Sequence, residues 1–565
     1  MARTVAIGIQ DFETVITNDY FYVDKTAFIK EWWESGDSVT LIARPRRFGK
    51  TLNMSMLERF FSLKYAGQGE LFEKLSIWQE EKYRALQGTI PVISLSFALI
   101  KEKNYELARK KICQLISDLY GNYSFLLDSD MFTQKEKERF MKISVDMDDT
   151  EATLSLYHLS DMLSRYYGRK VIILLDEYDT PMQEAYVDGY WDELVAFTRS
   201  LFNATFKTNP WLDRAVMTGI TRVSKESIFS DLNNLKVVTT TSEEYATAFG
   251  FTEDEVFEAM DEMGYQEKEK VKEWYDGFIF GKTKDIYNPW SILNYLDTGK
   301  FNTYWANTSS NSLIGRLVRE ASEEIKIDFE DLLEGKSIST ALDEQIVYNQ
   351  LNHNEAALWS LMLASGYLKA IKAETYIDVD VSEGQKPQYE LVLTNREVQM
   401  MFRTMIEEWF TTTRSDYNNF VKALLVGDID AMNSYMNRVA SECFSYFDTG
   451  NRATGAQPER FYHGFVLGLL VELADRYILT SNRESGFGRY DVMLKPKKAN
   501  DKAFILEFKV FNPRKDATLE ETVIAALTQI RDKQYEAELI AEGIPAENIR
   551  KYGFGFEGKK VLIGE

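Results

Sequence analysis

The sequence predicts an α/β protein with a largely parallel sheet in its first part, a helical middle region and a second α/β unit at its C-terminus. Up to about residue 240, short apolar runs alternate with segments of helical spacing, a pattern typical of a parallel sheet covered by helices. From about Ser242 the pattern becomes helical and acidic, and strand-like runs return after the turn-rich segment Asp448–Arg460. The 565 residues exceed what one hydrophobic core usually organises. We expect four domains, at residues 1–240, 241–310, 311–454 and 455–565.

Composition narrows the class of protein. Hydrophobic residues make up 45% of the chain and aromatic residues 13%, which indicates folded domains rather than disorder. The formal charge of −22 excludes a globally basic nucleic-acid-binding coat, so any such site must be a local patch. Two distant cysteines, Cys113 and Cys443, and three scattered histidines predict neither a disulfide framework nor a zinc centre. Without an apolar signal core or a run of membrane-spanning length, we expect a cytoplasmic protein that has no membrane partner.

Apolar runs define the expected strands of the first domain. Two segments between these runs, Leu52–Leu63 and Tyr105–Tyr120, have apolar residues spaced near 3.6 and are expected to be helices. The five expected strands are Val39–Ala43, Pro91–Phe97, Val171–Leu175, Ala215–Thr221 and Leu235–Thr240.

The stretch Ala43–Asn53, ARPRRFGKTLN, ends like a phosphate-binding loop but begins differently. In the pattern G-x-x-x-x-G-K-[ST], backbone N–H groups surround the phosphates and the lysine reaches the β- and γ-oxygens. Gly49, Lys50 and Thr51 stand in register, with Thr51 able to ligate Mg²⁺, whereas Arg44 occupies the place of the first glycine. Because a strand precedes this loop and a helix follows it, phosphates would rest on a helix N-terminus. We interpret it as a nucleotide site rather than a basic loop containing G-K-T by chance.

The run Val171–Thr180, VIILLDEYDT, is an apolar strand that ends in acidic residues, as a Walker-B element does. Asp176 would hold Mg²⁺ through water, and Glu177 would polarise the attacking water as a general base. The alternative is a buried strand whose acidic residues solvate the following turn. We expect Asp179 to have a structural role or to support its neighbours.

The strand at Ala215–Thr221 continues into Arg222. In this class of sheet, a polar residue at the carboxyl end of the neighbouring strand can sense the γ-phosphate. We assign Thr218 and Arg222 to that role, the alternative for Arg222 being a surface arginine on a loop.

Six segments in order resemble the AAA-ATPase-like P-loop family over about residues 5–310: YFYVDKTAFIKEWWE, ARPRRFGKTLNMSML, LLDEYDTP, TGITRVSKESIFSDLNNL, WYDGFIFG with IYNPWSILNYL, and YWANTSSNSLI. The resemblance implies that R-P-R-R-F before G-K-T is a family trait. It also implies an ATPase-type sheet with an extra strand between the P-loop strand and the Walker-B strand, and Tyr22–Thr26 near the adenine. The implied nucleotide-binding residues of the loop are Arg44, Arg46, Arg47, Phe48, Gly49, Lys50, Thr51 and Leu52.

The loop arginines have a physical consequence. Guanidinium groups suit phosphate oxygens, so Arg44, Arg46 and Arg47 add positive charge around the phosphates. We hypothesise that one of them substitutes for the tighter all-glycine cradle.

The middle of the chain is expected to be mainly helical. Trp274–Leu296 is aromatic and punctuated by glycine. The segment ALWSLMLASGYLKAI (357–371) predicts a helix, TYIDVDV (375–381) and YELVLTN (389–395) predict strands, and another helix follows. A helix followed by a hairpin is compatible with a winged-helix module.

The C-terminal unit is expected to comprise a helix at Phe461–Tyr477, three strands, a helix at Leu519–Ala541 and a closing strand pair. Glu507 and Lys509 stand two apart on one strand and therefore emerge on the same face. If the preceding strand pairs with it as a hairpin, Asp491 approaches Glu507 and both carboxylates can bind one divalent ion. Metal-bound water would attack a phosphodiester, with Lys509 positioning it or stabilising the developing charge. The alternative is a surface pair of Glu507 and Lys509.

The spacing D-x(15)-E-x-K, followed by a helix that carries Gln529, resembles the PD-(D/E)XK nuclease superfamily over about residues 455–565. The resemblance implies an α/β restriction-endonuclease-like fold, with Gln529 and Glu472 as accessory groups; we expect His463 to be structural. Residues 489–515 include eight Lys/Arg and only three Asp/Glu. This local excess fits contact with a phosphate backbone, and also an ordinary solvated face.

Our leading interpretation is an ATP-dependent switch coupled to a Mg²⁺-dependent (or Mn²⁺-dependent) nuclease that acts on DNA or RNA. The alternative is a nucleotide-binding regulatory protein whose nuclease-like domain binds nucleic acid or partners without cutting. A homo-oligomer is one assembly state that we consider. The resemblance also implies a bacterial origin and a role in defence or mobile elements.

Overall fold

The computed structural model describes residues 3–221, 228–229, 232–305, 312–342, 351, 355–374, 386–410, 414–443, 466, 470, 473, 476–481, 484–485, 488–489, 491–498, 501–558 and 560–565. It divides into two compact units. The first contains Met1–Leu317 and Ser337–Gln399, and the second contains Val318–Lys336 and Met400–Glu565. The four domain boundaries expected from the sequence stay predictions. No helix within the described ranges is long and apolar enough to cross a membrane.

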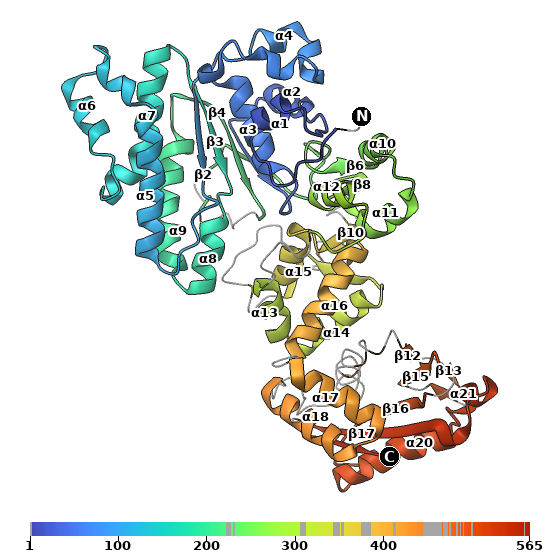
Figure 1. The fold of residues 1–565 in the computed structure, drawn as a ribbon. Helices are drawn as coiled ribbons and strands as arrows, with labels where there is room; N and C mark the ends of the chain where they lie inside the picture. The colour runs from blue at the N-terminus through green and yellow to red at the C-terminus, as the bar shows by residue number, and fades with distance from the viewer. Residues whose placement is uncertain are drawn as a thin grey trace. The chain divides into compact units, whose positions relative to one another are not determined.

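A five-stranded parallel sheet is the centre of the first unit (Figure 1). Its order is β2-β3-β4-β1-β5, so β4 lies between the P-loop strand β1 and the acidic strand β3, as the resemblance implied. β1 is buried along its whole length, because helices cover both faces of a parallel sheet. The strands are β1 (Val39–Ala43), β2 (Val92–Ser96), β3 (Val171–Asp176), β4 (Leu212–Gly219) and β5 (Leu235–Val238).

Helices cover this sheet on two faces. Figure 1 shows α5, α7 and α9 on one side and α1, α2 and α3 on the other. The helices are α1 (Phe12–Thr17), α2 (Ala27–Ser35), α3 (Lys50–Phe61), α4 (Glu81–Arg84), α5 (Tyr105–Gly121), α6 (Gln134–Met141), α7 (Asp149–Tyr167), α8 (Thr180–Asp188) and α9 (Trp191–Phe202). In register, Ala43 pairs with Gly219 and Leu175 with Met217, so the carboxyl ends of β1, β4 and β3 lie level. This edge is where ligands bind in open parallel sheets.

The next segment combines helices with a small antiparallel sheet of order β6-β8-β7. Its elements are β6 (Phe251–Thr252), α10 (Glu253–Met263), α11 (Lys268–Tyr275), β7 (Phe278–Phe280), β8 (Thr283–Tyr287) and α12 (Pro289–Thr298). Val256, Tyr275 and Ile292 are fully buried in its own apolar core. The region from about Ser242, which was expected to be helical, is therefore partly a sheet.

Three carboxylates of this segment lie together: Glu253, Asp276 and Asp285 offer oxygens within 4.8 Å of one another. Lys272 pairs with Glu253 and lies 3.8 Å from Asp285 Oδ1. Burial, followed by repulsion from Asp285, raises the pKa of Asp276 to about 7. The folded protein therefore keeps a proton on Asp276 at pH values where the unfolded chain has lost it.

We expect this proton to make wild-type stability fall as pH rises from about 4 to about 7, because the folded state binds more protons than the unfolded state in that window. Asp276→Asn removes the titrating group. The difference in urea midpoint between the variant and wild type should therefore be more in favour of the variant at pH 8 than at pH 5. This change corresponds to about 1 kcal/mol after allowance for solvent screening. Asp254→Asn, exposed on α10, controls for the loss of a charge. An Asp276→Asn effect that is equal at both pH values would contradict the expectation.

The middle region contains α13 (Ser312–Glu320), α14 (Glu323–Leu333), β9 (Ile338–Ala341), α15 (Glu355–Ala364), β10 (Leu368–Ala373), β11 (Gln388–Leu393) and α16 (Arg396–Phe410). The three strands form an antiparallel sheet of order β10-β11-β9. The predicted helix at 357–371 is wrong in its second half: the helix ends before Gly366, which has a left-handed φ of +86°, and β10 follows. The predicted strand at 375–381 lies outside the described residues. Assignment to the winged-helix fold stays a prediction.

The C-terminal part of the second unit is a mixed sheet of order β12-β15-β16-β17-β18, with β16 and β17 parallel and the other pairs antiparallel. The strands are β12 (Tyr477–Ser481), β15 (Val492–Pro496), β16 (Ala503–Val510), β17 (Ile549–Glu557) and β18 (Lys560–Gly564), with a short pair β13 (Glu484–Ser485) and β14 (Gly488–Arg489). The three predicted strands and the closing pair are confirmed. The helix expected at Phe461–Tyr477 falls almost wholly outside the described residues.

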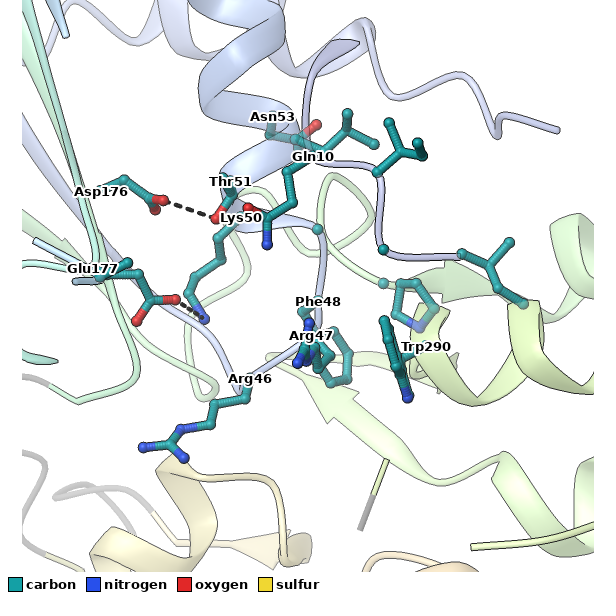
Figure 2. Close-up of a pocket in the computed structure, with 18 of the residues that line it drawn as sticks. Gln10, Arg46, Arg47, Phe48, Lys50, Thr51, Asn53, Asp176, Glu177 and Trp290 are labelled. Atoms are coloured by element: carbon teal, nitrogen blue, oxygen red, sulfur yellow. Dashed lines mark hydrogen bonds and ion pairs between the residues drawn. The ribbon is translucent and has the colours of Figure 1, made fainter. Parts of the chain in front are cut away.

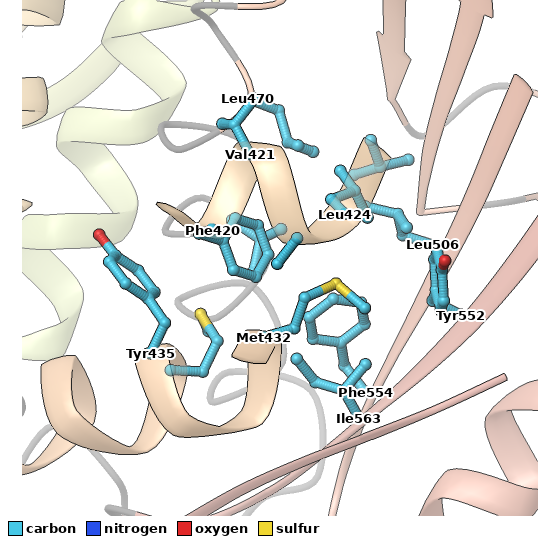
Figure 3. Packing of buried hydrophobic residues seen from close by; sticks show 14 of the residues in the cluster. Phe420, Val421, Leu424, Met432, Tyr435, Leu470, Leu506, Tyr552, Phe554 and Ile563 are labelled. Atoms are coloured by element: carbon cyan, nitrogen blue, oxygen red, sulfur yellow. The ribbon is translucent and has the colours of Figure 1, made fainter. Parts of the chain in front are cut away.

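Helices pack on both faces of this mixed sheet. They are α17 (Arg414–Val426), α18 (Ile429–Cys443), α20 (Leu519–Asp532) and α21 (Ala537–Ala541). Figure 3 shows Phe420 and Leu424 of α17 and Met432 of α18 facing the sheet residues Phe554 and Ile563 in one buried apolar cluster. This apolar packing holds the sheet that carries the charged residues of β16.

Candidate nucleotide and metal sites

A cavity of about 440 Å³ lies at the carboxyl edge of the parallel sheet (Figure 2). The P-loop and the end of β3 line one part of it, and the N-terminal segment and the start of α12 line another. The residues with direct bearing on its chemistry are Gln10, Tyr22, Arg46, Arg47, Phe48, Gly49, Lys50, Thr51, Leu52, Asp176, Glu177 and Trp290.

Gly49 and Lys50 form the start of α3 at this cavity. Gly49 caps the helix with a left-handed φ of +79°, which glycine adopts without strain. Lys50 is 4% exposed, and its Nζ donates to the carbonyl oxygens of Arg44 and Pro45, both at 3.0 Å. The same ammonium lies 3.8 Å from Glu177 Oε1. The helix N-terminus and a buried ammonium thus favour an anion here.

Thr51, Asp176 and Thr218 are joined by hydrogen bonds. Thr51 Oγ1 donates to Asp176 Oδ2 at 2.8 Å, and Thr218 Oγ1 donates to Asp176 Oδ1. Burial raises the pKa of Asp176, and the neighbouring Glu177 raises it further, while these hydrogen bonds and Lys50 oppose the shift. A hydroxyl and a carboxylate held face to face suit Mg²⁺, which prefers oxygen ligands and retains several waters.

Glu177 has a left-handed backbone, with φ of +52°. A non-glycine residue there carries strain of about 1 kcal/mol or more. Its amide N donates to Thr218 Oγ1 at 3.3 Å, and Thr180 Oγ1 donates to its Oε2 at 3.2 Å. The carboxylate faces the cavity beside Lys50 (Figure 2), where it can approach a water molecule next to a bound phosphate.

Tyr178 and Asp179 form hydrogen bonds with the backbone that directly follows β4. Asp179 is fully buried, and its Oδ2 accepts from the backbone N of Ile220 and of Thr221, both at 2.9 Å. The Tyr178 hydroxyl donates to the carbonyl oxygen of Thr221 at 2.7 Å. A Cβ at Gly219 would lie 2.7 Å from Asp179 Oδ1, so glycine permits this close approach. The structure thus places Asp179 in a supporting position. Arg222 lies outside the described residues.

The three loop arginines occupy different environments. Arg47 lines the cavity, and its guanidinium carbon lies 4.3 Å from the ring centroid of Trp290. Arg46 also lines it and donates from Nη2 to Gln183 Oε1 at 2.9 Å. Arg44 does not line it: its side chain is fully buried, donates to the carbonyl oxygens of Thr239 and Glu244, and lies over the ring of Phe280.

The expectation that Arg44 adds charge around the phosphates is therefore corrected. Its position at the start of the loop turns the side chain towards the segment after β5, away from the cavity. Burial lowers the pKa of this guanidinium to about 9.

We expect Arg44→Ala to lower the urea midpoint by the equivalent of about 2–4 kcal/mol, because it removes a buried side chain with several hydrogen bonds. Arg47→Ala should instead weaken Mg·ATP binding about tenfold, since it removes a charge from the cavity without emptying the core. Calorimetric titration with Mg·ATP and urea unfolding separate the two effects. A larger loss of affinity in Arg44→Ala than in Arg47→Ala would reinstate the sequence-based hypothesis.

Sequence reasoning missed Gln10 and Trp290, which both line the cavity, Trp290 in contact with the Arg47 guanidinium. The alternation of apolar residues that reveals strands carries no signal for residues that only the fold brings to the P-loop. Tyr22 and Lys25, from the segment expected near the adenine, do line the cavity. Lys25 Nζ pairs with both carboxylate oxygens of Glu255 at 2.7 Å.

The second candidate site lies on β16. The side chain of Glu507 is 2% exposed, and Val492 pairs with Leu506, which puts Asp491 beside Glu507. Asp491 Oδ2 accepts from the backbone N of Phe508 at 2.8 Å. The structure therefore brings the two predicted carboxylates to neighbouring positions, with Asp491 directly before β15 and Glu507 on β16.

Gln529 of α20 joins the residues of this site. Its Nε2 donates to Glu507 Oε1, and its Oε1 accepts from Lys509 Nζ at 2.7 Å. Glu507 and Lys509 thus lie on one face of β16, as their spacing predicted. Gln529 Nε2 also donates to the hydroxyl of Tyr535 at 3.1 Å.

Tyr535 was not expected at the site, because it falls inside the single helix predicted at Leu519–Ala541. That prediction is wrong in its middle: α20 ends at Asp532 and α21 begins at Ala537. Burial raises its pKa, and the charges of Glu507 and Asp491 raise it further. Two carboxylates and an ammonium on a buried strand end fit a divalent ion and a phosphate ester. Glu472 and His463 lie outside the described residues.

Comparisons with known proteins agree with this division into two sites. Residues 6–229 match a family model described as Predicted AAA-ATPase, and residues 457–565 match one described as PD-(D/E)XK nuclease superfamily. A protein of Azotobacter chroococcum mcd 1, described as an uncharacterized protein in the vnfD 5′ region, is 25% identical over 561 residues. That similarity covers 96% of this chain and 95% of the relative.

Domains of these two kinds generally use a nucleotide and a divalent metal. By the two family matches, the chain carries a predicted AAA-ATPase domain in its N-terminal part and a PD-(D/E)XK nuclease superfamily domain in its C-terminal part.

Proposed function

We propose that this protein binds and hydrolyses ATP in the cavity at the P-loop, and that the nucleotide controls a metal-dependent nuclease site in the C-terminal domain. The observation that carries the proposal is the hydrogen bond between Thr51 and Asp176, which joins the G-K-T loop to the acidic strand end inside a cavity that also holds Lys50. Residues 125 positions apart converge there on the arrangement that phosphoryl transfer requires.

In the ATPase site, Lys50 and the amides at the start of α3 would bind the phosphates. Thr51 and Asp176 would hold Mg²⁺, which when bound neutralises phosphate charge. Glu177 would orient the attacking water and accept its proton. Thr218, hydrogen-bonded to both Asp176 and the amide of Glu177, would keep the two carboxylates in their relative orientation.

In the nuclease site, Asp491 and Glu507 would hold Mg²⁺ or Mn²⁺, which when bound lowers the pKa of a water molecule. Lys509, fixed by Gln529, would stabilise negative charge that develops on the phosphodiester of DNA or RNA. The basic run between residues 489 and 515 supports contact with the nucleic-acid backbone.

Helix α16 supports coupling between the two activities. Its first residues, Arg396–Gln399, belong to the unit with the nucleotide cavity, and from Met400 onward it belongs to the unit with the carboxylate site. The chain therefore passes from one unit to the other within α16.

The test incubates the full chain with labelled single- and double-stranded DNA and RNA, with Mg²⁺ or Mn²⁺, and with ATP, ADP or no nucleotide. We expect cleavage that requires metal and changes with the nucleotide in wild type, but not with the nucleotide in Lys50→Ala. Cleavage independent of nucleotide would contradict the coupling. Metal-dependent binding of nucleic acid without any cleavage would instead favour a regulatory protein.

A further inference from the structure

The backbone of the P-loop is held from segments that lie far away in the sequence. The carbonyl oxygen of Arg46 accepts hydrogen bonds from Trp305 Nε1 at 3.0 Å and from Asn288 Nδ2 at 3.3 Å. Pro45 lies against the turn at Gly366, where a Cβ would come within 2.9 Å of Pro45 Cγ. One side of the loop therefore faces the nucleotide cavity. The other side packs against Asn288, Trp305 and Gly366, which follow the sheet in the sequence.

Trp305 is itself held by Glu397, the second residue of α16. The backbone N of Trp305 donates to Glu397 Oε1 at 2.6 Å, and Ser291 Oγ donates to Glu397 Oε2 at 2.8 Å. Trp305 and Glu397 are each only 1% exposed. A buried carboxylate is unfavourable unless hydrogen-bond donors satisfy it, and one of these donors is the residue that contacts the P-loop.

The contact acts on a strained part of the loop. Arg47 has φ of +65°, a left-handed conformation that non-glycine residues keep only when their surroundings enforce it. The carbonyl of Arg46 belongs to the peptide group whose orientation sets the φ of Arg47. A hydrogen bond that fixes this carbonyl therefore fixes the direction in which Arg47 leaves the loop, towards Trp290 and the cavity.

We propose that Glu397 is a positioning residue for the nucleotide reaction: through Trp305 it fixes the Arg46 carbonyl, holds Arg47 in its left-handed conformation and so presents the Arg47 guanidinium to the nucleotide phosphates. This role rests on the proposed binding of ATP in the same cavity. It also explains how a loop without the first glycine keeps a defined shape, since side chains from outside the sheet supply the support.

The test compares Trp305→Phe, Glu397→Ala and Glu397→Gln in the full chain. Phenylalanine keeps an aromatic ring but has no N–H for Arg46. Alanine at 397 removes both acceptors, whereas glutamine keeps an acceptor for the Trp305 amide and can donate to Ser291. Trp359→Phe, which alters an equally buried tryptophan of α15, is the matched control. Dissociation constants for ATP, ADP and AMP and kcat for ATP are measured beside urea unfolding.

We expect Trp305→Phe and Glu397→Ala to weaken ATP binding about tenfold, the scale of losing one hydrogen bond and one well-placed charge. The loss should shrink from ATP to AMP, because Arg47 acts on phosphates, and a general loss of folding would not follow phosphate number. Glu397→Gln and Trp359→Phe should stay within about threefold of wild type on the same reasoning.

Wild-type affinity for ATP in both Trp305→Phe and Glu397→Ala would overturn the positioning role, as would an equal loss for all three nucleotides. Lys50→Ala is measured as well, so that failure of the positioning role can be told apart from failure of the proposed ATP binding. If wild type binds ATP and Lys50→Ala does not, the nucleotide site stands and only the positioning role is judged. If wild type binds no nucleotide, both proposals fall.

Discussion

Replacing Lys50 with alanine is expected to reduce ATP hydrolysis by about 10²–10³-fold, the scale of removing one preorganised charge from a phosphoryl-transfer site. The ammonium of Lys50 is buried at the base of the cavity, and carbonyl oxygens of the loop already hold it in place. Lys25 and Lys101 also line the cavity, but among the described residues only Lys50 forms an ion pair with Glu177. Steady-state hydrolysis of Mg·ATP by purified wild type and variant measures the effect.

Lys74→Ala, which removes an exposed lysine of the same domain, is the control for altered charge. Urea unfolding checks that Lys50→Ala is folded, since the substitution also breaks two hydrogen bonds within the loop. Equal hydrolysis by wild type and Lys50→Ala would remove the ATPase assignment.

Replacing Glu507 with glutamine is expected to lower metal-dependent cleavage of nucleic acid by roughly a thousandfold or more, because a neutral amide is a poor ligand for a divalent ion whose charge drives the reaction. Glutamine has nearly the same shape, so its contact with Gln529 and the packing of β16 should survive. Single-turnover cleavage with Mn²⁺ at saturating protein measures the chemical step apart from binding. Asp491→Asn should have an effect of similar size.

Glu520→Gln, exposed on α20, removes the same charge from the same domain and should cleave like wild type. Cleavage that persists in Glu507→Gln would point to a contaminating nuclease. If Asp491→Asn cleaves normally while Glu507→Gln does not, the two carboxylates do not share one ion.

Local sequence predicted the parts of the fold and site that depend on local pattern. β1 and the first five residues of β3 coincide with apolar runs, because a strand buried on both faces requires continuous apolar residues. Gly49, Lys50 and Thr51 could be placed because a strand, a loop and a helix follow one another directly in the chain. The shared face of Glu507 and Lys509 followed from the two-residue period of a strand.

Other features depend on the tertiary fold and gave no local signal. Arg44 reads like its neighbours Arg46 and Arg47, yet its side chain turns towards carbonyl oxygens of a segment about 200 residues away. The apolar segment at 357–371 has helical composition throughout, but Gly366 ends the helix and the remainder pairs with β11. Support of the P-loop by Trp305 and Glu397 spans more than 250 residues and appears only in three dimensions.

The central claim is that the cavity at Lys50, Thr51 and Asp176 binds one nucleoside triphosphate with its metal. Calorimetric titration of the purified full chain with Mg·ATP tests it most directly. The account predicts one molecule bound per chain in wild type, with loss of binding in Lys50→Ala and wild-type binding in Lys74→Ala. Absence of binding in wild type, or equal binding in wild type and Lys50→Ala, would contradict it.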